Sequence, residues 1–349
     1  MSVLEQPIVN PQPSADFDVD TPIDQNYHQI ESDRLKRWEE TLSAEYWSYR
    51  EAWNEYPKQR IVGEVPLHLD IEATSNCNLR CTMCPRTELV ERGEFWKVEN
   101  VDFEQYAKLI DHGVKHGLKS VKYNYLGEPL MNPRLIEMIR YAKQRGVVDV
   151  MFNTNATLLT ERVARQLIES GLDKLFFSFD SPNREHYQAI RINANYDKVL
   201  HNIRRFHQIR DELGAIKPFT RVSMVVMREN QAELTHFRRL FEPIVDAVAY
   251  VDYLDHTGQS NPDKTVVPLG QRQSKFCCPQ LWQRMFVNSD GVVTVCCSDS
   301  ARELKIGNAF EQSLHEIWTG DAYQRLRDLH ASGRSAEVPI CARCPLAQY

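Results

Sequence analysis

The nine cysteines of this chain are grouped, and the grouping restricts what it can fold into more than any other feature of the sequence. The groups include the spacings Cys-x3-Cys-x2-Cys and Cys-x2-Cys, and no cysteine lies between Cys84 and Cys277. The positions are Cys77, Cys81, Cys84, Cys277, Cys278, Cys296, Cys297, Cys341 and Cys344. Such groups bring several thiolates to one point, as a metal ion or an iron–sulfur cluster requires, whereas disulfides are typical of small secreted scaffolds. The sequence therefore predicts metal binding.

Length and composition are those of an ordinary globular protein. The 349 residues suffice for one large and one smaller domain, with 42% hydrophobic and 26% charged residues. The net charge of −6 argues against general binding to nucleic acid or anionic membranes. No apolar run approaches the roughly 18 residues of a membrane helix, and the N-terminus lacks the basic and apolar regions of a signal peptide. We therefore expect a cytoplasmic protein with no nucleic-acid partner and no membrane span.

Strand-like and helix-like patterns alternate through the middle of the chain. The strand-like runs are Leu67–Ala73, Ser120–Tyr125, Val148–Asn153, Lys174–Phe179, Thr220–Val226 and Ala247–Tyr253. The helical patterns lie near Phe103–His116, Pro133–Arg145, Glu161–Ser170, Tyr196–Leu213 and Gln231–Phe241. Such alternation implies parallel strands with right-handed crossovers. The six strands predict an α/β fold, a partial (β/α)6 TIM-like barrel with its functional groups at the carboxyl ends of the strands.

Three cysteines follow directly on the first predicted strand. Cys77, Cys81 and Cys84 lie on one loop, and three thiolates can hold three irons of a four-iron cluster while the fourth iron stays open for chemistry. Four thiolates would instead close the site, leaving electron transfer or a structural role. The alternative is a zinc loop with His68 as a candidate fourth ligand.

In spacing and placement this loop resembles the Cys-x3-Cys-x2-Cys motif of the radical SAM superfamily. The resemblance implies that the three cysteines bind a 4Fe–4S cluster whose open iron chelates S-adenosyl-L-methionine. In that family, reduction breaks a sulfur–carbon bond of this cofactor, and the resulting 5′-deoxyadenosyl radical abstracts hydrogen from a substrate. A reductant such as flavodoxin or ferredoxin is the implied protein partner.

Short motifs at successive strand ends add to the resemblance. The segment from Leu126 to Pro129 resembles the family's Gly-Gly-Glu-Pro, with leucine in place of the first glycine, and Ala156 replaces the glycine of a Thr-Asn-Gly segment. Ser178-Phe179-Asp180 resembles a Ser-x-Asp segment, and an arginine follows where the family often has one that reaches the cofactor carboxylate. Taken singly, each motif is more often ordinary hydrogen-bonded structure. The cofactor-binding residues that the resemblance implies are Glu128, Asn155, Ser178, Asp180 and Arg191.

The remaining cysteines resemble the C-terminal SPASM/twitch extension of radical SAM enzymes, which carries auxiliary clusters. A complete SPASM domain has seven cysteines, whereas this region has six, so the resemblance implies one auxiliary 4Fe–4S cluster. The implied ligands are Cys278, Cys296, Cys341 and Cys344. Cys277 and Cys297 are then spare buried thiols. A structural zinc site with the same four ligands is the alternative.

The flanking regions complete the expected organisation. Residues 1–30 are polar and aperiodic, which predicts a loosely packed tail. The apolar residues between Ser32 and Tyr56 have helical spacing and predict an amphipathic helix on the main domain, with substrate docking as the alternative. The polar loop 257–264 marks a boundary, beyond which two short strands flank the hairpin turn Ser289-Asp290-Gly291. The expected units are the tail and helix at 1–64, the partial barrel at 65–260 and a small α+β iron–sulfur domain at 261–349.

The substrate is less constrained than the cofactors. Tyr253 and Asp255, beside His256, are the candidate catalytic residues because they follow the last predicted barrel strand, although ordinary loop polarity is the alternative. We expect a radical SAM oxidoreductase or lyase acting on a small, carbohydrate- or nucleoside-like metabolite by oxidation, elimination, epimerisation or decarboxylation. The alternatives are a peptide-modifying enzyme of the same superfamily and a non-catalytic iron–sulfur or zinc scaffold protein.

Overall fold

The computed structural model describes residues 27–348, apart from 257–260, 267–269 and 274–275. Its centre is one ten-stranded sheet. In spatial order the strands are β1 (Tyr27–Glu31), β9 (Ala247–Asp252), β8 (Phe219–Val226), β6 (Lys174–Ser178), β5 (Asp149–Thr154), β4 (Ser120–Tyr123), β2 (His68–Ile71), β10 (Arg284–Val287), β11 (Val292–Thr294) and β12 (Lys305–Asn308). Residues 1–26 of the expected tail and residues 257–260 of the expected boundary loop lie outside the described residues.

The six strands predicted for the barrel form the continuous parallel part of this sheet. Neighbours along the series β2, β4, β5, β6, β8 and β9 all pair in parallel. Val121 and Phe152 are fully buried in β4 and β5, as expected of strands that helices cover. The predicted α/β class and partial barrel are therefore confirmed.

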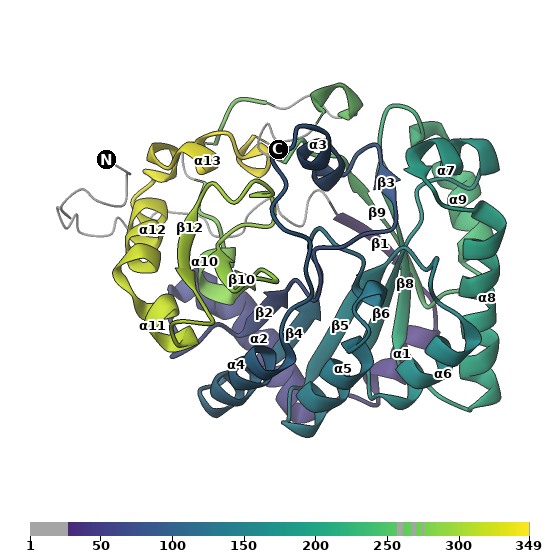
Figure 1. The fold of residues 1–349 in the computed structure, drawn as a ribbon, viewed down its shortest axis with the longest axis horizontal. Helices are drawn as coiled ribbons and strands as arrows, with labels where there is room; N and C mark the ends of the chain where they lie inside the picture. Colours follow the sequence, from purple (N-terminus) through teal and green to yellow (C-terminus); the bar gives the residue numbers. More distant parts are fainter. Residues whose placement is uncertain (1–26, 257–260, 267–269, 274–275, 349) are drawn as a thin grey trace.

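Helices connect these strands and cover the outer face of the sheet (Figure 1). They are α4 (Phe103–Lys115), α5 (Leu135–Gln144), α6 (Glu161–Glu169), α7 (Arg184–Ile190), α8 (Tyr196–Glu212) and α9 (Leu234–Phe241). The side chains of Asp102, Thr160 and Asn195 accept hydrogen bonds from the first turns of α4, α6 and α8, which fixes where these helices begin. The sequence did not predict α7, because seven residues are too few to show a helical period.

The N-terminal segment closes the amino-terminal end of the barrel. The predicted single helix is two helices, α1 (Arg34–Glu39) and α2 (Ala44–Gln59), separated where Ser43 caps the second. Trp38 and Tyr46 are buried against Phe219 and other residues at the starts of the barrel strands. Strand β1, which pairs antiparallel with β9, corrects the expectation that the tail extends to residue 30. Its polar sequence carries no strand signal, and backbone pairing with β9 provides the order.

The C-terminal segment continues the same sheet. Strand β10 pairs in parallel with β2, and the predicted hairpin joins it to β11 through Gly291, whose φ of 86° suits glycine. The helices here are α10 (Gln280–Gln283), α11 (Leu314–Thr319), α12 (Asp321–Ala331) and α13 (Pro339–Ala342), and they surround the β10–β12 edge (Figure 1). Single 3-10 turns are η2 (Pro129–Met131), η3 (Gln231–Glu233), η4 (Pro262–Lys264), η5 (Ser335–Glu337) and η6 (Pro345–Ala347). None of the helices formed by the described residues has the length and apolar character that a membrane crossing requires.

Candidate active site

A cavity of about 380 Å³ lies where the carboxyl ends of the barrel strands meet the C-terminal segment. All three cysteines of the first group line it: Cys77, Cys81 and Cys84. The opposing walls come from the ends of β2, β4, β5, β6 and β8 and from β10. The structure thus brings the loop after the first barrel strand to the edge of the sheet where parallel α/β proteins place their functional groups.

A close backbone approach holds the cysteine loop against the end of β4. Glu128 N donates a hydrogen bond of 2.8 Å to Asn76 O. A Cβ on Gly127 would overlap Thr74 O and would lie 2.8 Å from Asn76 O. Only glycine fits at this position, which is the physical reason for the glycine in the Gly-Glu-Pro segment.

Two short strands fix the other side of the cysteine loop. Strand β3 (Arg80–Cys81) pairs antiparallel with β7 (Arg191–Ile192), so that Cys81 lies directly opposite Arg191. Cys84 then occupies the position directly before helix α3 (Pro85–Glu91). The sequence predicted neither the strand pair nor α3, because two-residue strands and a single short helix leave no periodic pattern.

The thiols of this loop fit a cluster. Burial raises the pKa of Cys77, Cys81 and Cys84, that of Cys81 to about 12, so these groups remain protonated thiols until a metal displaces the protons. Among the residues with a described position, no three Cys, His, Asp or Glu side chains meet closely enough to hold a single metal ion. In a four-iron cluster each cysteine binds a different iron, so the thiols need not converge on one point. Three thiols on one loop that line one cavity fit the three-cysteine ligand set of such a cluster.

Glu128 lies at the cavity with its carboxylate fixed by the end of β5. One oxygen accepts a hydrogen bond from Thr154 Oγ1 at 2.6 Å, and the other accepts one from Asn155 N at 2.7 Å. Burial raises the pKa of Glu128 above its ordinary value, although these hydrogen bonds oppose the rise. The carboxylate is therefore a preorganised acceptor at the cavity wall.

Asn155 joins the end of β5 to the cysteine loop. Its Nδ2 donates to Asn78 Oδ1 at 3.0 Å, and its Oδ1 accepts from Thr157 N at 3.0 Å. The next residue, Ala156, is buried with a φ of 56°, a left-handed conformation that glycine adopts at lower cost. This explains why the related segment has glycine there.

An ion pair lies beside Cys81. Arg191 Nη2 is 2.6 Å from Asp180 Oδ2, and Asp180 Oδ1 accepts a hydrogen bond from Val225 N at 2.9 Å. Arg191 and Ser178 line the cavity, whereas the fully buried Asp180 lies behind Arg191. Within the described part of the chain Arg191 Nε has no hydrogen-bond partner. Of the five expected cofactor-binding residues, four therefore line the cavity and the fifth positions one of them.

The two expected catalytic residues are not brought to the cavity. Tyr253 is buried in a small apolar cluster with Ile190 and Met227. Asp255 does not line the cavity either, although the adjacent His256 does. Both residues follow the last barrel strand as expected, but β9 ends at Asp252 and the chain turns at His256, whose φ is 48°.

Sequence reasoning missed the charged residues that the strands themselves place at the cavity. Asp70, Lys122 and Arg284 line it from β2, β4 and β10. A charged residue inside an otherwise apolar strand was the available signal. Arg284 also required knowing that β10 lies beside β2, which residue spacing does not reveal.

The second cysteine group gathers at the C-terminal end of the chain. Cys278 and Cys344 share one apolar cluster with Phe276. Burial, and after it the nearby Cys344, Cys341 and Cys297, raise the pKa of Cys278. Cys277 lies apart in the main core and is fully buried.

The adjacent pair Cys296 and Cys297 lies between this group and the main cavity. Cys296 Sγ accepts a hydrogen bond from Ser298 N at 3.3 Å, and its hydrogen bond with Cys297, followed by burial, raises its pKa. Cys297 instead lines the main cavity and lies 3.6 Å from Gln280 Nε2. The auxiliary group therefore abuts the cavity that the first cysteine group lines.

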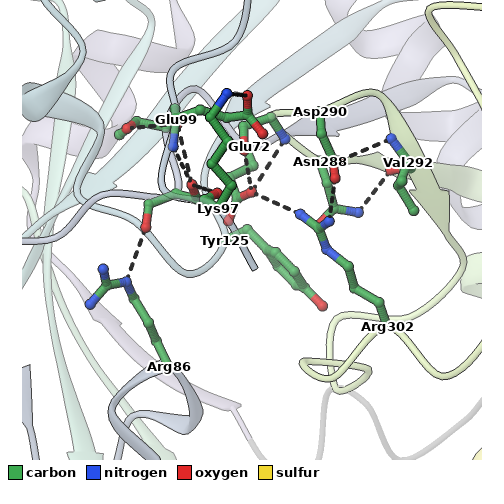
Figure 2. A network of polar contacts seen from close by, with 12 residues as sticks. Glu72, Arg86, Lys97, Glu99, Tyr125, Asn288, Asp290, Val292 and Arg302 are labelled. Carbon is green, nitrogen blue, oxygen red and sulfur yellow. Dashed lines mark hydrogen bonds and ion pairs between the residues drawn. The ribbon is translucent and has the colours of Figure 1, made fainter. Parts of the chain in front are cut away.

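A polar network joins the loop after β2 to the C-terminal segment (Figure 2). The buried carboxylate of Glu72 accepts a hydrogen bond from Ser289 Oγ at 3.0 Å and lies 3.5 Å from Arg302 Nη2. Arg302 also pairs with Asp290 at 2.6 Å, and its guanidinium lies 3.5 Å from the ring centroid of Trp96. Burial raises the pKa of Glu72 to about 7. These contacts fix the auxiliary cysteine group relative to the cavity.

Comparison with known sequences agrees with this geometry. A family model described as the radical SAM superfamily matches residues 71–241, and one described as an iron-sulfur cluster-binding domain (SPASM) matches residues 277–345. The tungsten-containing aldehyde ferredoxin oxidoreductase cofactor-modifying protein of Pyrococcus furiosus is 28% identical over 323 residues, covering 80% of this chain and 87% of that protein. A GTP 3′,8-cyclase of Geobacter sulfurreducens is 28% identical over 203 residues, 58% of this chain and 59% of that enzyme.

Comparison with solved structures supports the fold. SuiB of Streptococcus suis bound to its precursor peptide SuiA superposes with a TM-score of 0.62 at 15% identity. The superposition covers 86% of this chain and 80% of SuiB. At this identity the similarity concerns the fold alone.

Proposed function

This chain belongs to the radical SAM superfamily and carries a C-terminal SPASM domain, and we propose that it is an oxidoreductase or lyase that acts on a small molecule. When bound, a 4Fe–4S cluster and S-adenosyl-L-methionine would supply a 5′-deoxyadenosyl radical that abstracts hydrogen from this substrate. The observation that carries this proposal is the single cavity lined by Cys77, Cys81, Cys84, Glu128 and Arg191. Three thiols that face a cavity with fixed polar groups are suited to chemistry rather than to a closed structural site.

The residues around the cavity have distinct proposed roles. Cys77, Cys81 and Cys84 would hold the first cluster. Glu128, whose two oxygens are fixed by Thr154 and by the backbone of the next residue, would accept hydrogen bonds from the amino group of the cofactor.

Arg191 is the proposed partner of the cofactor carboxylate. Asp180 holds its guanidinium beside Cys81, and its Nε lacks a partner within the described residues. Ser178 and Asn155 complete the proposed cofactor wall, Ser178 from the end of β6 and Asn155 through its bond to the cysteine loop. Because these groups are fixed by one another, little rearrangement is needed to orient a bound molecule.

We propose Cys278, Cys296, Cys341 and Cys344 as ligands of one auxiliary cluster. They lie near one another and near Cys297, which lines the cavity. This position suits electron transfer between that cluster and a substrate radical, in which case the net reaction is an oxidation and an external reductant such as flavodoxin or ferredoxin supplies electrons. If the auxiliary cluster only fixes the C-terminal segment, proposed to start near residue 261, the reaction is a redox-neutral lyase reaction.

The curated relatives favour a small-molecule substrate. The Pyrococcus furiosus protein is named for modifying a cofactor, and the Geobacter sulfurreducens enzyme is named for the cyclisation of GTP. Both names refer to small molecules, and that of the second enzyme to a nucleotide, which supports a carbohydrate- or nucleoside-like metabolite as the proposed substrate. The second candidate is peptide modification, which the fold similarity to SuiB with its precursor peptide favours.

Anaerobic turnover tests the proposal directly. We expect the reconstituted chain to form 5′-deoxyadenosine from S-adenosyl-L-methionine after reduction with dithionite, and the Cys81→Ala variant to form none. Cys277→Ala is the matched control, because this thiol is fully buried in the main core and does not line the cavity. A fully iron-loaded parent that forms no 5′-deoxyadenosine would favour a non-catalytic scaffold.

A further inference from the structure

Three charged side chains occupy the part of the cavity wall that β10, β2 and β4 form. Asp70 lies opposite Lys122 in the parallel register of β2 and β4 and opposite Phe286 in that of β10 and β2. Residues in register on neighbouring strands point to the same face of a sheet. Side chains two residues apart in one strand also share a face, so Arg284 points to the same face as Phe286. All four line the cavity. The strands therefore present two cations and one carboxylate to the cavity.

The carboxylate is already shared. Asp70 Oδ2 lies 3.4 Å from Arg284 Nη1 and 3.4 Å from His68 Nε2. Burial lowers the pKa of His68, so its ring is neutral near pH 7. The pKa of Asp70 is lowered to about 2, because its contact with His68 and then the charges of Arg284 and Lys122 outweigh the opposing effect of burial. Asp70 is thus ionised, and it is the carboxylate that Arg284 already engages.

Lys122 has no such partner. Among the residues that the structure describes, its ammonium forms no hydrogen bond and no ion pair. Arg284 Nε is likewise buried and without a hydrogen-bond partner there. Burial lowers the pKa of Lys122 to about 8, which still leaves it mostly protonated at pH 7. The charge of Asp70 attracts Lys122, but without a hydrogen bond or close ion pair, so the donors of the ammonium stay available to a bound anion. Buried charged groups of this kind gather in binding sites.

Resting on the proposed function, we propose that Lys122 and Arg284 form an anion subsite that holds a carboxylate or phosphate group of the substrate. The subsite is distinct from Arg191, which Asp180 holds beside Cys81. A substrate anchored there by its anionic group would present a fixed part of its carbon skeleton to the cysteine loop in the same cavity. The substrate class is therefore an acidic metabolite, a sugar or nucleoside that carries a phosphate ester or a carboxylate.

Inorganic phosphate and acetate are the probes that test this subsite. The Tm of the anaerobically reconstituted full chain is measured against increasing phosphate or acetate, with chloride keeping the ionic strength constant. The variants are Lys122→Met, Arg284→Met and, as the matched control, Lys119→Met, whose lysine pairs with Glu45 at the surface. We expect at least one probe to raise the Tm of the parent and of the control by roughly 2 °C at several times its Kd. The two cavity variants should show no rise. A response to phosphate alone indicates a phosphate ester, and one to acetate alone indicates a carboxylate.

The probe-free Tm separates a binding role from a structural one. Because Lys122 has no hydrogen bond or close ion pair to lose, and its attraction to Asp70 is offset by relief of the cost of burying its charge, Lys122→Met should stay close to the parent Tm without probe. A lower probe-free Tm combined with an unchanged probe response would overturn the proposal, as would a parent that responds to neither anion. The same preparations are assayed for 5′-deoxyadenosine. Nucleoside formation without an anion response counts against the subsite alone, whereas an anion response without nucleoside counts against the proposed function alone.

Discussion

Replacing Gly127 by alanine tests whether the close approach of β4 to the cysteine loop holds the first cluster site. The added Cβ would overlap Thr74 O and lie 2.8 Å from Asn76 O, and both are backbone atoms that no side-chain rotation can move. Overpacking of this kind costs about 1–3 kcal/mol. Displacing the loop also breaks the bond from Glu128 N to Asn76 O, worth about 1 kcal/mol. We therefore expect Gly127→Ala to lower the free energy of unfolding by about 2–4 kcal/mol.

The assay compares Tm and iron content of the anaerobically reconstituted variant with those of Gly63→Ala. Neither glycine has a left-handed φ, and a Cβ on Gly63 would meet only Val65 O at 3.2 Å and a flexible tyrosine ring at 3.9 Å. We expect the Tm of Gly127→Ala to fall by at least about 4 °C, with a loss of cluster iron, and that of Gly63→Ala to stay within about 2 °C of the parent. If the two variants have the same Tm and iron content, the loop is not held by this contact.

Three further predictions concern the buried charges and the auxiliary thiols. The pKa of Glu72 is about 7 in the folded chain, above its ordinary value of 4.5. The folded chain therefore holds the proton of Glu72 more tightly than the unfolded chain does. The resulting stabilisation is complete below about pH 4.5 and is lost as the pH rises through 7. Glu72→Gln should therefore equal the parent near pH 4.5 and exceed it at pH 8 by up to roughly 3 kcal/mol; parallel pH profiles of Tm would contradict this. Asp180→Asn leaves Arg191 as an unpaired buried cation and should cost about 3–5 kcal/mol, so an unchanged Tm refutes the pairing. Cys296→Ser should lose about four irons per chain and Cys297→Ser none; iron analysis giving the reverse would exchange the proposed ligands.

Local pattern was sufficient for the barrel strands and their helices. The strand predicted at Lys174–Phe179 is β6, which spans Lys174–Ser178. The helix predicted at Glu161–Ser170 is α6, which spans Glu161–Glu169. Such agreement is possible because the repeat of apolar residues that distinguishes strands from helices is visible within a short stretch of consecutive residues. Elements without a period escaped prediction, among them β1, the β3–β7 pair and α7.

The candidate site was predictable to the extent that its residues stand at strand ends. Glu128 lines the cavity with the three cysteines of the first group, as its position after a strand implied. Arg191 lines it too, but it follows helix α7, and only the family resemblance indicated it. Tyr253 also follows a strand, but its ring packs into an apolar cluster instead. Position at a strand end therefore indicates the edge of the sheet, and only packing decides whether a side chain faces the cavity.

The sequence by itself determined the parallel α/β core, the cysteine loop and the order of polar motifs along it, because each of these is encoded within a few neighbouring residues. Only the tertiary structure decided that β10 lies beside β2 and that Arg284 thereby shares a cavity with Lys122 and Cys81. It also placed Cys297, and not Cys296, at the wall of that cavity. These pairings join residues far apart in the chain, and their energies depend on burial and on counter-charges that no local pattern records.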